Sequence, residues 1–155
     1  MRVHIGSDHA GWETKQMLVA ALAERGLEVV DHGPGAYDAE DDYPPFCLAT
    51  GVAVAAEPGS LGIVLGGSGN GEQIAANKVD GVRAALAWSE ETARLAREHN
   101  DANVVSVGAR MHPPDQVLAF VETFLATPFS ADERHQRRIG QLAAFEESHQ
   151  VPLRD

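Results

Sequence analysis

Five short apolar runs alternate with longer stretches whose apolar residues recur every three or four positions, and this alternation constrains the fold most strongly. The apolar runs predict strands at residues 2–7, 27–31, 61–65, 82–86 and 104–107. The longer stretches predict helices at residues 11–25, 44–56, 70–79, 89–98, 113–125 and 131–148. Continuously apolar strands, each followed by a helix, are typical of a parallel sheet that is covered on both faces. We therefore expect an α/β fold, a three-layer αβα sandwich with a doubly wound, Rossmann-like five-stranded parallel sheet and a C-terminal helix.

Size and charge exclude several classes of protein. A chain of 155 residues predicts one domain over residues 1–155, with an irregular tail from residue 150. A formal net charge of −11 argues against binding to nucleic acid or to an anionic membrane. No stretch approaches the ~18 apolar residues of a membrane span, and the first residues lack the apolar core of a signal peptide, so we expect a cytoplasmic protein.

Patterns for metal ligands are weak in this chain. A single cysteine, Cys47, excludes an intrachain disulfide and a cysteine-rich zinc site. The histidines lack the spacing of a zinc motif, so no metal is predicted. The turn-rich loop at residues 33–42 is expected to be a solvated acidic surface, and metal binding there is a weaker alternative. Its acidic residues are Asp38, Glu40, Asp41 and Asp42.

The carboxyl ends of the predicted strands are the place to look for a ligand, because ligands of open α/β sheets bind there. Residues 66–72, after the third strand, hold four glycines in six positions. A turn without side chains lets backbone N–H groups approach an oxygen anion at the start of the next helix. The pattern is neither a dinucleotide fingerprint nor a Walker loop, and a tight turn without ligand is the alternative.

Acidic and histidine side chains follow the same strands. Glu72 lies in the first turn of the helix after the glycine loop. It can complement the helix dipole, or it can serve as a general base if the site is closed enough for desolvation to raise its pKa. Asp8 and His9 follow the first strand, where a capping acid and a surface histidine explain them as well as a site does.

Two arginines of the last predicted helix share one face. Arg134 and Arg138 are four residues apart, and we expect both to point toward packed surface. Two arginines that are packed together need an anion such as phosphate, which predicts a phosphate site. The alternative interpretation is that their aliphatic stems only cover an apolar patch. Arg137 lies off this face and is expected to form a surface ion pair with Glu133. The face also carries Leu142 and Phe145.

His99 and Asn100 end the predicted helix before the fifth strand. They can be a cation and a cap at a helix C-terminus, and that position also favours the protonated imidazole of a proton donor. Such a C-terminus lies at the edge of the sheet opposite the glycine loop. If His99 acts with the loop, it comes from a neighbouring subunit, which predicts a homodimer.

The chain resembles the type B ribose-5-phosphate isomerases over nearly its whole length. The resemblance rests on Gly-Ser-Asp-His-Ala-Gly at residues 6–11, on residues 66–78, on His99-Asn100, on residues 108–111 and on the arginine-bearing last helix. It implies interconversion of ribose 5-phosphate and ribulose 5-phosphate in the non-oxidative branch of the pentose phosphate pathway, through a cis-enediolate. It further implies a phosphosugar substrate, no metal or cofactor, and a homodimer with composite active sites; the choice between dimer and tetramer stays open.

The resemblance also implies roles for individual residues. Glu72 matches the general base and His99 the acid that opens the sugar ring. Many members of the family carry a cysteine as base in the glycine loop; here that thiol is absent, and the chain looks like the subgroup that uses glutamate. The positions that match substrate contacts are Asp8, His9, Gly67, Ser68, Gly69, Asn70, Gly71, Asn100 and Arg110, and those that match phosphate contacts are Arg134 and Arg138.

Three alternative functions remain open on the sequence alone. A hexose-6-phosphate isomerase of the same fold, for allose or galactose phosphate, needs more room near the glycine loop. A non-catalytic phosphosugar-binding module needs the loop and the arginines but neither Glu72 nor His99. A purely structural subunit leaves the arginine pair without an anion.

Overall fold

The computed structural model describes residues 1–153 and confirms the α/β class. Its strands are β1 (Arg2–Ser7), β2 (Glu28–Asp31), β3 (Leu61–Gly66), β4 (Ala84–Leu86) and β5 (Val104–Gly108). Its helices are α1 (Trp12–Glu24), α2 (Tyr43–Ala56), α3 (Asn70–Ala76), α4 (Glu90–Asn100), α5 (Pro114–Ala126) and α6 (Glu133–Ser148). All strand pairs are parallel, in the order β2-β1-β3-β5-β4.

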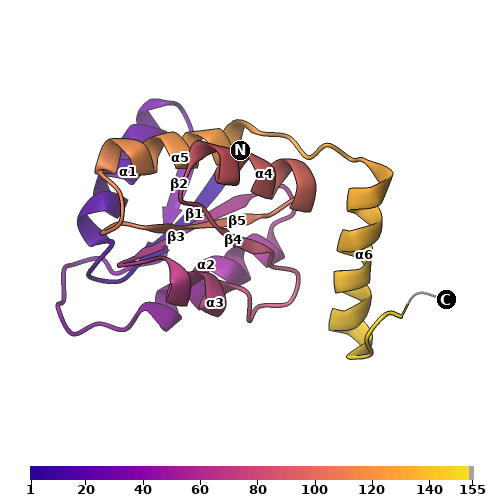
Figure 1. Ribbon diagram of the computed structural model, residues 1–155. Helices are drawn as coiled ribbons and strands as arrows, with labels where there is room; N and C mark the ends of the chain where they lie inside the picture. Colours follow the sequence, from indigo (N-terminus) through magenta and orange to yellow (C-terminus); the bar gives the residue numbers. More distant parts are fainter. Residues whose placement is uncertain (154–155) are drawn as a thin grey trace.

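The helices cover the sheet on both faces, as predicted for a doubly wound sandwich. Helices α1, α4 and α5 lie over one face, and α2 and α3 lie over the other (Figure 1). The chain leaves β1 toward one edge of the sheet and returns through α2 to β3 on the other side of β1. The order of the strands therefore reverses between β1 and β3, and the crevice beyond their carboxyl ends is the expected place for a ligand.

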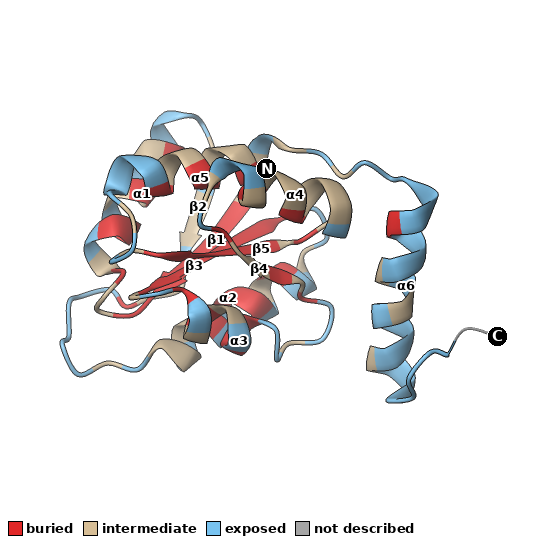
Figure 2. Cartoon of the chain, viewed as in Figure 1, coloured by how far each residue is buried: buried red, intermediate tan, exposed pale blue. Residues whose placement is uncertain are grey.

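The core lies against both faces of the central strands. Every residue of β3 and β5 is buried, which explains why these segments read as continuous apolar runs (Figure 2). Ile63 and Val105 belong to the cluster under α1, α4 and α5, whereas Val64 and Val104 face α2 and α3.

Element boundaries differ from the prediction mainly after the glycine loop. The helix expected to reach residue 79 ends at Ala76, and the strand expected from residue 82 begins at Ala84. The side chain of Asn77 explains both changes, because its Nδ2 donates to the carbonyl of Ala84 (2.9 Å) and its Oδ1 accepts from the N–H of Ala84 (2.8 Å). Residues 150–153 carry no helix or strand, and positions 154 and 155 of the predicted irregular tail lie outside the described residues. Among residues 1–153, none of the helices is both long and apolar enough for a membrane crossing.

Helix α6 stands beside the sandwich rather than against it (Figures 1 and 2). His135 is its one buried residue. The expectation that Arg134 and Arg138 point toward packed surface is therefore wrong within one chain, because both residues are exposed. Leu142 and Phe145 on the same face are 58% and 43% exposed. Helix α6 therefore has an apolar face, but the described residues of the same chain cover that face only in part.

Candidate active site

The turn after β1 is built by Asp8. Its buried carboxylate accepts hydrogen bonds from the N–H groups of Ala10 (2.9 Å) and Gly11 (3.2 Å). This arrangement closes the turn that leads into α1, but Asp8 does not cap the helix: Gly11 is the N-cap residue and no side chain bonds to the first turn of α1. The same carboxylate lies close enough to Glu72 to raise the pKa of Glu72 by its charge.

The glycine-rich loop is held against β5. Gly69 has a φ of 82°, which favours glycine, and its carbonyl accepts a hydrogen bond from the Ser106 hydroxyl (2.7 Å). The carbonyls of Gly66 and Gly67 accept from the N–H groups of Ala109 (2.8 Å) and Arg110 (3.1 Å). The backbone of the loop is therefore fixed before any ligand arrives, as an oxyanion site requires.

Glu72 is a buried carboxylic acid in the first turn of α3. The side chain is 4% exposed and lies over the α-carbon of Gly66, where any side chain at position 66 would collide with it. Burial raises the pKa of Glu72, and the charge of Asp8 adds to this effect, while hydrogen bonds from its own N–H and that of Gly69 oppose it. The sequence left open whether the helix terminus lowers the pKa of Glu72 or desolvation raises it, and the structure favours desolvation. A carboxylate with a raised pKa is a better proton acceptor.

Cys47 is far from the loop in sequence but near it in space. The residue is fully buried on α2, and the charges of Glu72 and Asp8 act on its thiol. Burial and these two charges raise the pKa of Cys47, so the thiol stays protonated at neutral pH. Of the Cys47 thiol and the Glu72 carboxylate, the carboxylate is therefore the one that can accept a proton.

His9 is held by an acidic side chain of the loop at residues 33–42. One oxygen of Asp41 accepts from the backbone N–H of His9 and from its Nδ1, each at 2.8 Å. This bond, together with the charge of Asp8, raises the pKa of His9. The prediction of a wholly solvated acidic loop is thus wrong for Asp41, whose side chain is only 9% exposed. The loop is anchored by the fully buried Lys15, which donates to the carbonyl of Pro34 (2.7 Å).

His99 lies at the other end of the sheet. Arg83, immediately before β4, donates through Nε to the carbonyl of Asn100 (3.0 Å), so the end of α4 sits beside the amino end of β4. Asp101, with a φ of 43°, caps the helix rather than Asn100. The His99 side chain is 39% exposed and its ring lies against that of His135.

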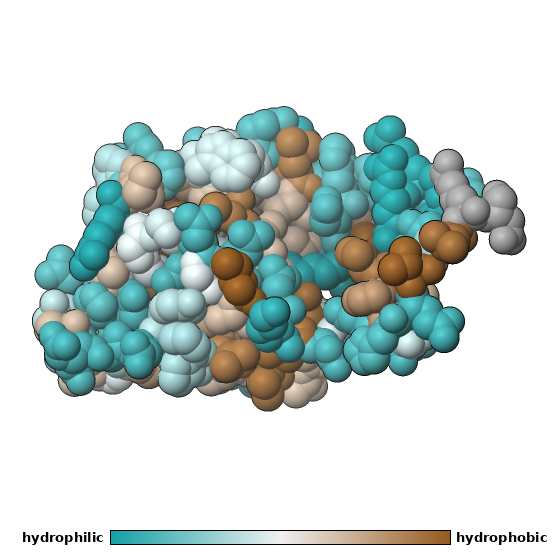
Figure 3. Space-filling view, turned by 60° about the horizontal axis from the view of Figure 1, so that its bottom comes forward, coloured by the Kyte–Doolittle hydropathy of each residue, from teal (hydrophilic) through white to brown (hydrophobic). Residues whose placement is uncertain are grey.

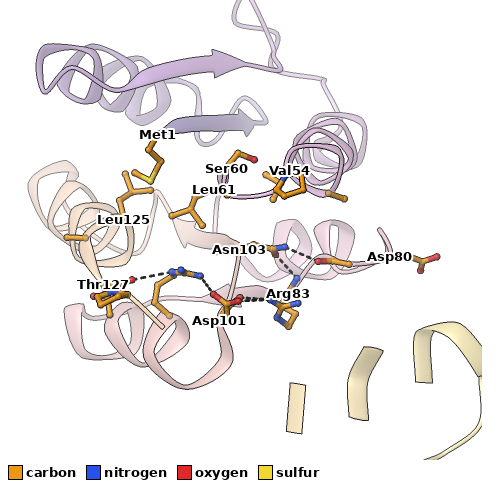
Figure 4. A pocket seen from close by; sticks show the side chains of 17 residues that line it. Met1, Val54, Ser60, Leu61, Asp80, Arg83, Asp101, Asn103, Leu125 and Thr127 are labelled. Atoms are coloured by element: carbon orange, nitrogen blue, oxygen red, sulfur yellow. Dashed lines mark hydrogen bonds and ion pairs between the residues drawn. The ribbon is translucent and has the colours of Figure 1, made fainter. Parts of the chain in front are cut away.

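A cavity of about 620 Å³ at the amino end of the sheet is lined by two arginines (Figure 4). Both are already occupied: Arg83 donates to the carbonyl of Asp101 (2.7 Å), and Arg97 donates to the carboxylate of Asp101 (2.7 Å). Arg97 also donates to the carbonyl of Thr127 (3.3 Å), at the start of the segment that leads to α6. This cluster therefore ties the end of α4 to its surroundings and offers no free cation to an anion.

A groove of about 870 Å³ runs between the sandwich and α6, and apolar surface flanks it (Figure 3). Ile74 on α3, Trp88 after β4 and Leu142 on α6 are each 58–60% exposed. Leu48 and Val52 of α2 add exposed apolar side chains on the same side of the sheet as α3. Large apolar side chains of three helices and of the turn after β4 are thus exposed around this groove.

The predicted site residues fall into two groups. The structure brings together those at the carboxyl edge, namely Asp8, His9, Gly67, Ser68, Gly69, Asn70, Gly71, Glu72 and Arg110. A second group lies around the end of α4 and on α6, namely His99, Asn100, Arg134 and Arg138. No ion pair joins Arg137 to Glu133 in residues 1–153, which corrects that expectation.

Four residues near these groups were missed from the sequence. Asp41 binds His9, Ser106 holds the loop, and the Tyr43 ring lies against Gly71, where an added Cβ would come within 2.7 Å of it. His135 packs on His99. A strand serine and a tyrosine at the start of a helix carry no local signal of such contacts. Among the described residues, no cluster of three His, Cys, Asp or Glu side chains is arranged to hold a metal ion.

Comparison with known proteins gives one consistent result. The ribose/galactose isomerase family model matches residues 3–142. Ribose-5-phosphate isomerase B of Mycolicibacterium paratuberculosis is 59% identical over 152 residues, which cover 98% of this chain and 96% of the relative. The protein of the same name from Mycobacterium tuberculosis is 57% identical, over 98% of this chain and 94% of its own length. The crystal structure of ribose-5-phosphate isomerase B from Mycoplasma genitalium with bound ribulose-5-phosphate is 40% identical, with a TM-score of 0.92 over 95% of this chain and 97% of that one.

Proposed function

Because this chain belongs to the ribose/galactose isomerase family, we propose that it interconverts D-ribose 5-phosphate and D-ribulose 5-phosphate. The single observation that carries the chemistry is the buried Glu72 with its raised pKa, beside a fixed loop of backbone N–H groups. An aldose–ketose isomerase needs this pair of features, a base for a carbon-bound proton and donors for the charge that develops on oxygen. The activity would serve the non-oxidative branch of the pentose phosphate pathway in the cytoplasm.

Glu72 is the proposed base. In the open-chain aldose, its carboxylate removes the proton from C2, and the electron pair of that bond forms the C1=C2 double bond of a cis-enediolate. The negative charge moves to O1, where the N–H groups of residues 67–71 can stabilise it; one such donor is worth about 3–4 kcal/mol. Glu72 then returns its proton to C1, while the O2 proton moves to O1, with Ser68 as the proposed relay, and the ketose results.

His99 is the proposed acid for opening the furanose ring. It donates a proton to the ring oxygen as the bond from C1 to that oxygen breaks, water takes the proton of the anomeric hydroxyl, and the aldehyde forms. Because His99 and Glu72 lie at opposite ends of the sheet, we propose that each active site takes Glu72 from one subunit and His99 from its partner. The exposed apolar side chains of α2, α3 and α6 support a homodimer and would be covered by it.

The substrate phosphate is proposed to bind Arg134 and Arg138, which are exposed on α6; Arg134 has a long, exposed ion pair with Asp132 (3.9 Å) that a phosphate would replace. Forked guanidinium groups suit phosphate oxygens. His9, Asp8, Asn100 and Arg110 are proposed to contact the sugar. Because the phosphate is remote from C1 and C2, its binding energy serves to position the reacting carbons.

Turnover by metal-stripped protein tests the function. Ribose 5-phosphate and allose 6-phosphate would be compared in the presence of a chelator, and we expect rapid pentose turnover. If only the hexose phosphate reacts, the proposed isomerase chemistry is supported and the proposed pentose substrate is wrong. If neither sugar reacts while the folded protein still binds inorganic phosphate, the chain is a phosphosugar-binding module. Light scattering at the assay concentration would distinguish a dimer from a tetramer.

A further inference from the structure

His135 is the one residue through which α6 is buried, and it is buried against His99. Its side chain is 3% exposed, in a helix whose other residues are half-buried or exposed. The His99 and His135 ring centroids are 4.4 Å apart, with an angle of 34° between the planes. The ring of His135, on a helix that is otherwise exposed or half-buried, therefore packs against the ring of His99, the proposed acid.

Hydrogen bonds of residues 130–135 hold the His135 ring in place. Its Nδ1 shares a hydrogen bond with the Ser130 hydroxyl (2.9 Å), and its backbone N–H donates to the carbonyl of Asp132 (2.9 Å). The N–H of Ser130 in turn donates to the carbonyl of Glu98, the residue before His99 (3.1 Å). Ser130 therefore links the His135 ring to the backbone of α4 at the residue before His99, and this link holds the His135 ring against the His99 ring.

Burial and nearby charges act on the protonation of His135. The pKa of His135 is lowered by burial, by the charge of His99, and by Arg134 and Arg138. The buried His135 ring is therefore held toward its neutral form, in which it lies against the His99 ring. The other charged groups near this pair are Glu98 and Glu91 on α4 and Asp132 before α6.

We propose that His135 is a positioning residue for His99, holding the imidazole in the orientation from which it protonates the ring oxygen of the sugar. The proposal rests on the proposed function, because it assigns His135 a part in the same ring-opening step. It is carried by the ring contact, by the burial of His135 alone on α6, and by the hydrogen bond that fixes its Nδ1.

Three variants at one position separate the ring from its hydrogen bond. His135→Ala removes both, His135→Phe keeps a ring against His99, and His135→Asn keeps a partner for Ser130 without a ring. Glu133→Gln, at an exposed neighbour on the same helix, is the matched control. We expect kcat/KM for ribose 5-phosphate to fall about 10- to 100-fold in His135→Ala and in His135→Asn, because a misplaced catalytic group costs this much. His135→Phe and the control should stay within about threefold of the wild type.

A double-mutant cycle with His99→Asn distinguishes positioning from a merely structural role. If His135 acts through His99, the loss caused by His135→Ala should vanish in a His99→Asn background. Competitive inhibition by inorganic phosphate should also be unchanged in His135→Ala, because Arg134 and Arg138 are not displaced. Equal losses in both backgrounds, or weakened phosphate inhibition, would mean that His135 only anchors α6 and would overturn the proposal.

Proton NMR of the His99 ring supplies a readout that needs no activity. Contact with an aromatic ring displaces the His99 ring signals, so they should move in His135→Ala and in His135→Asn but much less in His135→Phe. Unmoved signals in the first two variants would overturn the proposal. If His135→Ala does not fold, His135→Asn carries the test. A wild-type protein without turnover would instead refute the proposed function, whatever the NMR signals show.

Discussion

One carboxylate oxygen of Asp41 accepts two hydrogen bonds from His9, from its backbone N–H and from its Nδ1, both at 2.8 Å. The two residues are 32 positions apart, and the contact fixes which nitrogen of His9 faces the protein. Nε2 is left to face a ligand. Since the bond also raises the pKa of His9, the imidazole remains a cation to a higher pH than an isolated histidine does.

Asp41→Asn should therefore weaken substrate binding in a manner that depends on pH. Without the carboxylate, the pKa of His9 falls toward its usual value of about 6.5, so in the pH range just above that value the variant lacks a cation that the wild type keeps. We expect KM for ribose 5-phosphate to rise several-fold in that window and to approach the wild-type value below it. Steady-state kinetics across pH would measure this. Glu40→Gln, in the same loop but exposed, is the control, and an equal rise in KM there would contradict the assignment.

Glu72→Gln should abolish turnover while the sugar phosphate still binds. The amide keeps the shape of the side chain but cannot accept a proton from C2, so we expect kcat to fall by at least about 10³-fold. Turnover assays would measure kcat, and calorimetric titration with ribose 5-phosphate would measure binding without needing turnover. Turnover near the wild-type rate would assign the base elsewhere.

The same substitution should stabilise the folded protein at neutral pH. Because the folded-state pKa of Glu72 is raised, its ionisation disfavours the folded state; this cost is absent below the unfolded-state pKa and complete above the folded-state pKa. Urea unfolding should thus show Glu72→Gln to be more stable than the wild type at pH 7 and equal to it in acid. If the stability difference between Glu72→Gln and the wild type instead grows as the pH falls, the raised pKa of Glu72 is contradicted.

Mixed dimers test whether the sites are composite. Equal amounts of Glu72→Gln and His99→Asn subunits, refolded together, form hybrids in which one of the two sites has both groups intact. We expect recovery of about a quarter of wild-type activity, since about half of the dimers are hybrids. No recovery in hybrids verified by mass spectrometry would mean that both groups act from one chain.

Lys15→Met should destabilise the protein by about 2–4 kcal/mol. The lysine Nζ donates to Asp31 (2.8 Å) and to the carbonyl of Pro34. Its removal takes the charged partner from Asp31, which keeps only the N–H of Gly33 (2.9 Å), and takes the Lys15 donor from the carbonyl of Pro34. Asp31 is 32% exposed, so water can replace part of the loss. Chemical unfolding would measure the change, and Lys78→Met, at an exposed lysine, should be nearly neutral.

The sequence predicted the strands well because each of the central ones is buried on both faces. β3 and β5 read as uninterrupted apolar runs for that reason. The helix after the glycine loop was predicted too long, because the pairing of Asn77 with Ala84 ends it and depends on a residue seven positions away. Local patterns carry no record of such a partner.

The site was predicted in part for the same physical reason. Glu72 and Asp8 follow buried strands directly, and strand ends meet at one edge of a parallel sheet. Asp41 reaches His9 only through the path of a loop, and the sequence could not show that path. The face of α6 was misjudged because an amphipathic pattern says that a helix has a partner, not whether the partner belongs to the same chain.

Residues 66 and 72 compete for a single volume, since the Glu72 carboxylate lies where a side chain at position 66 would begin. A side chain at position 66 therefore requires the Glu72 carboxylate to move away from the end of β3. Even the methyl group of an alanine at this position would displace the carboxylate, although residue 72 itself is unchanged. The glycine at position 66 thus determines where the proton acceptor stands, through the space that it leaves empty.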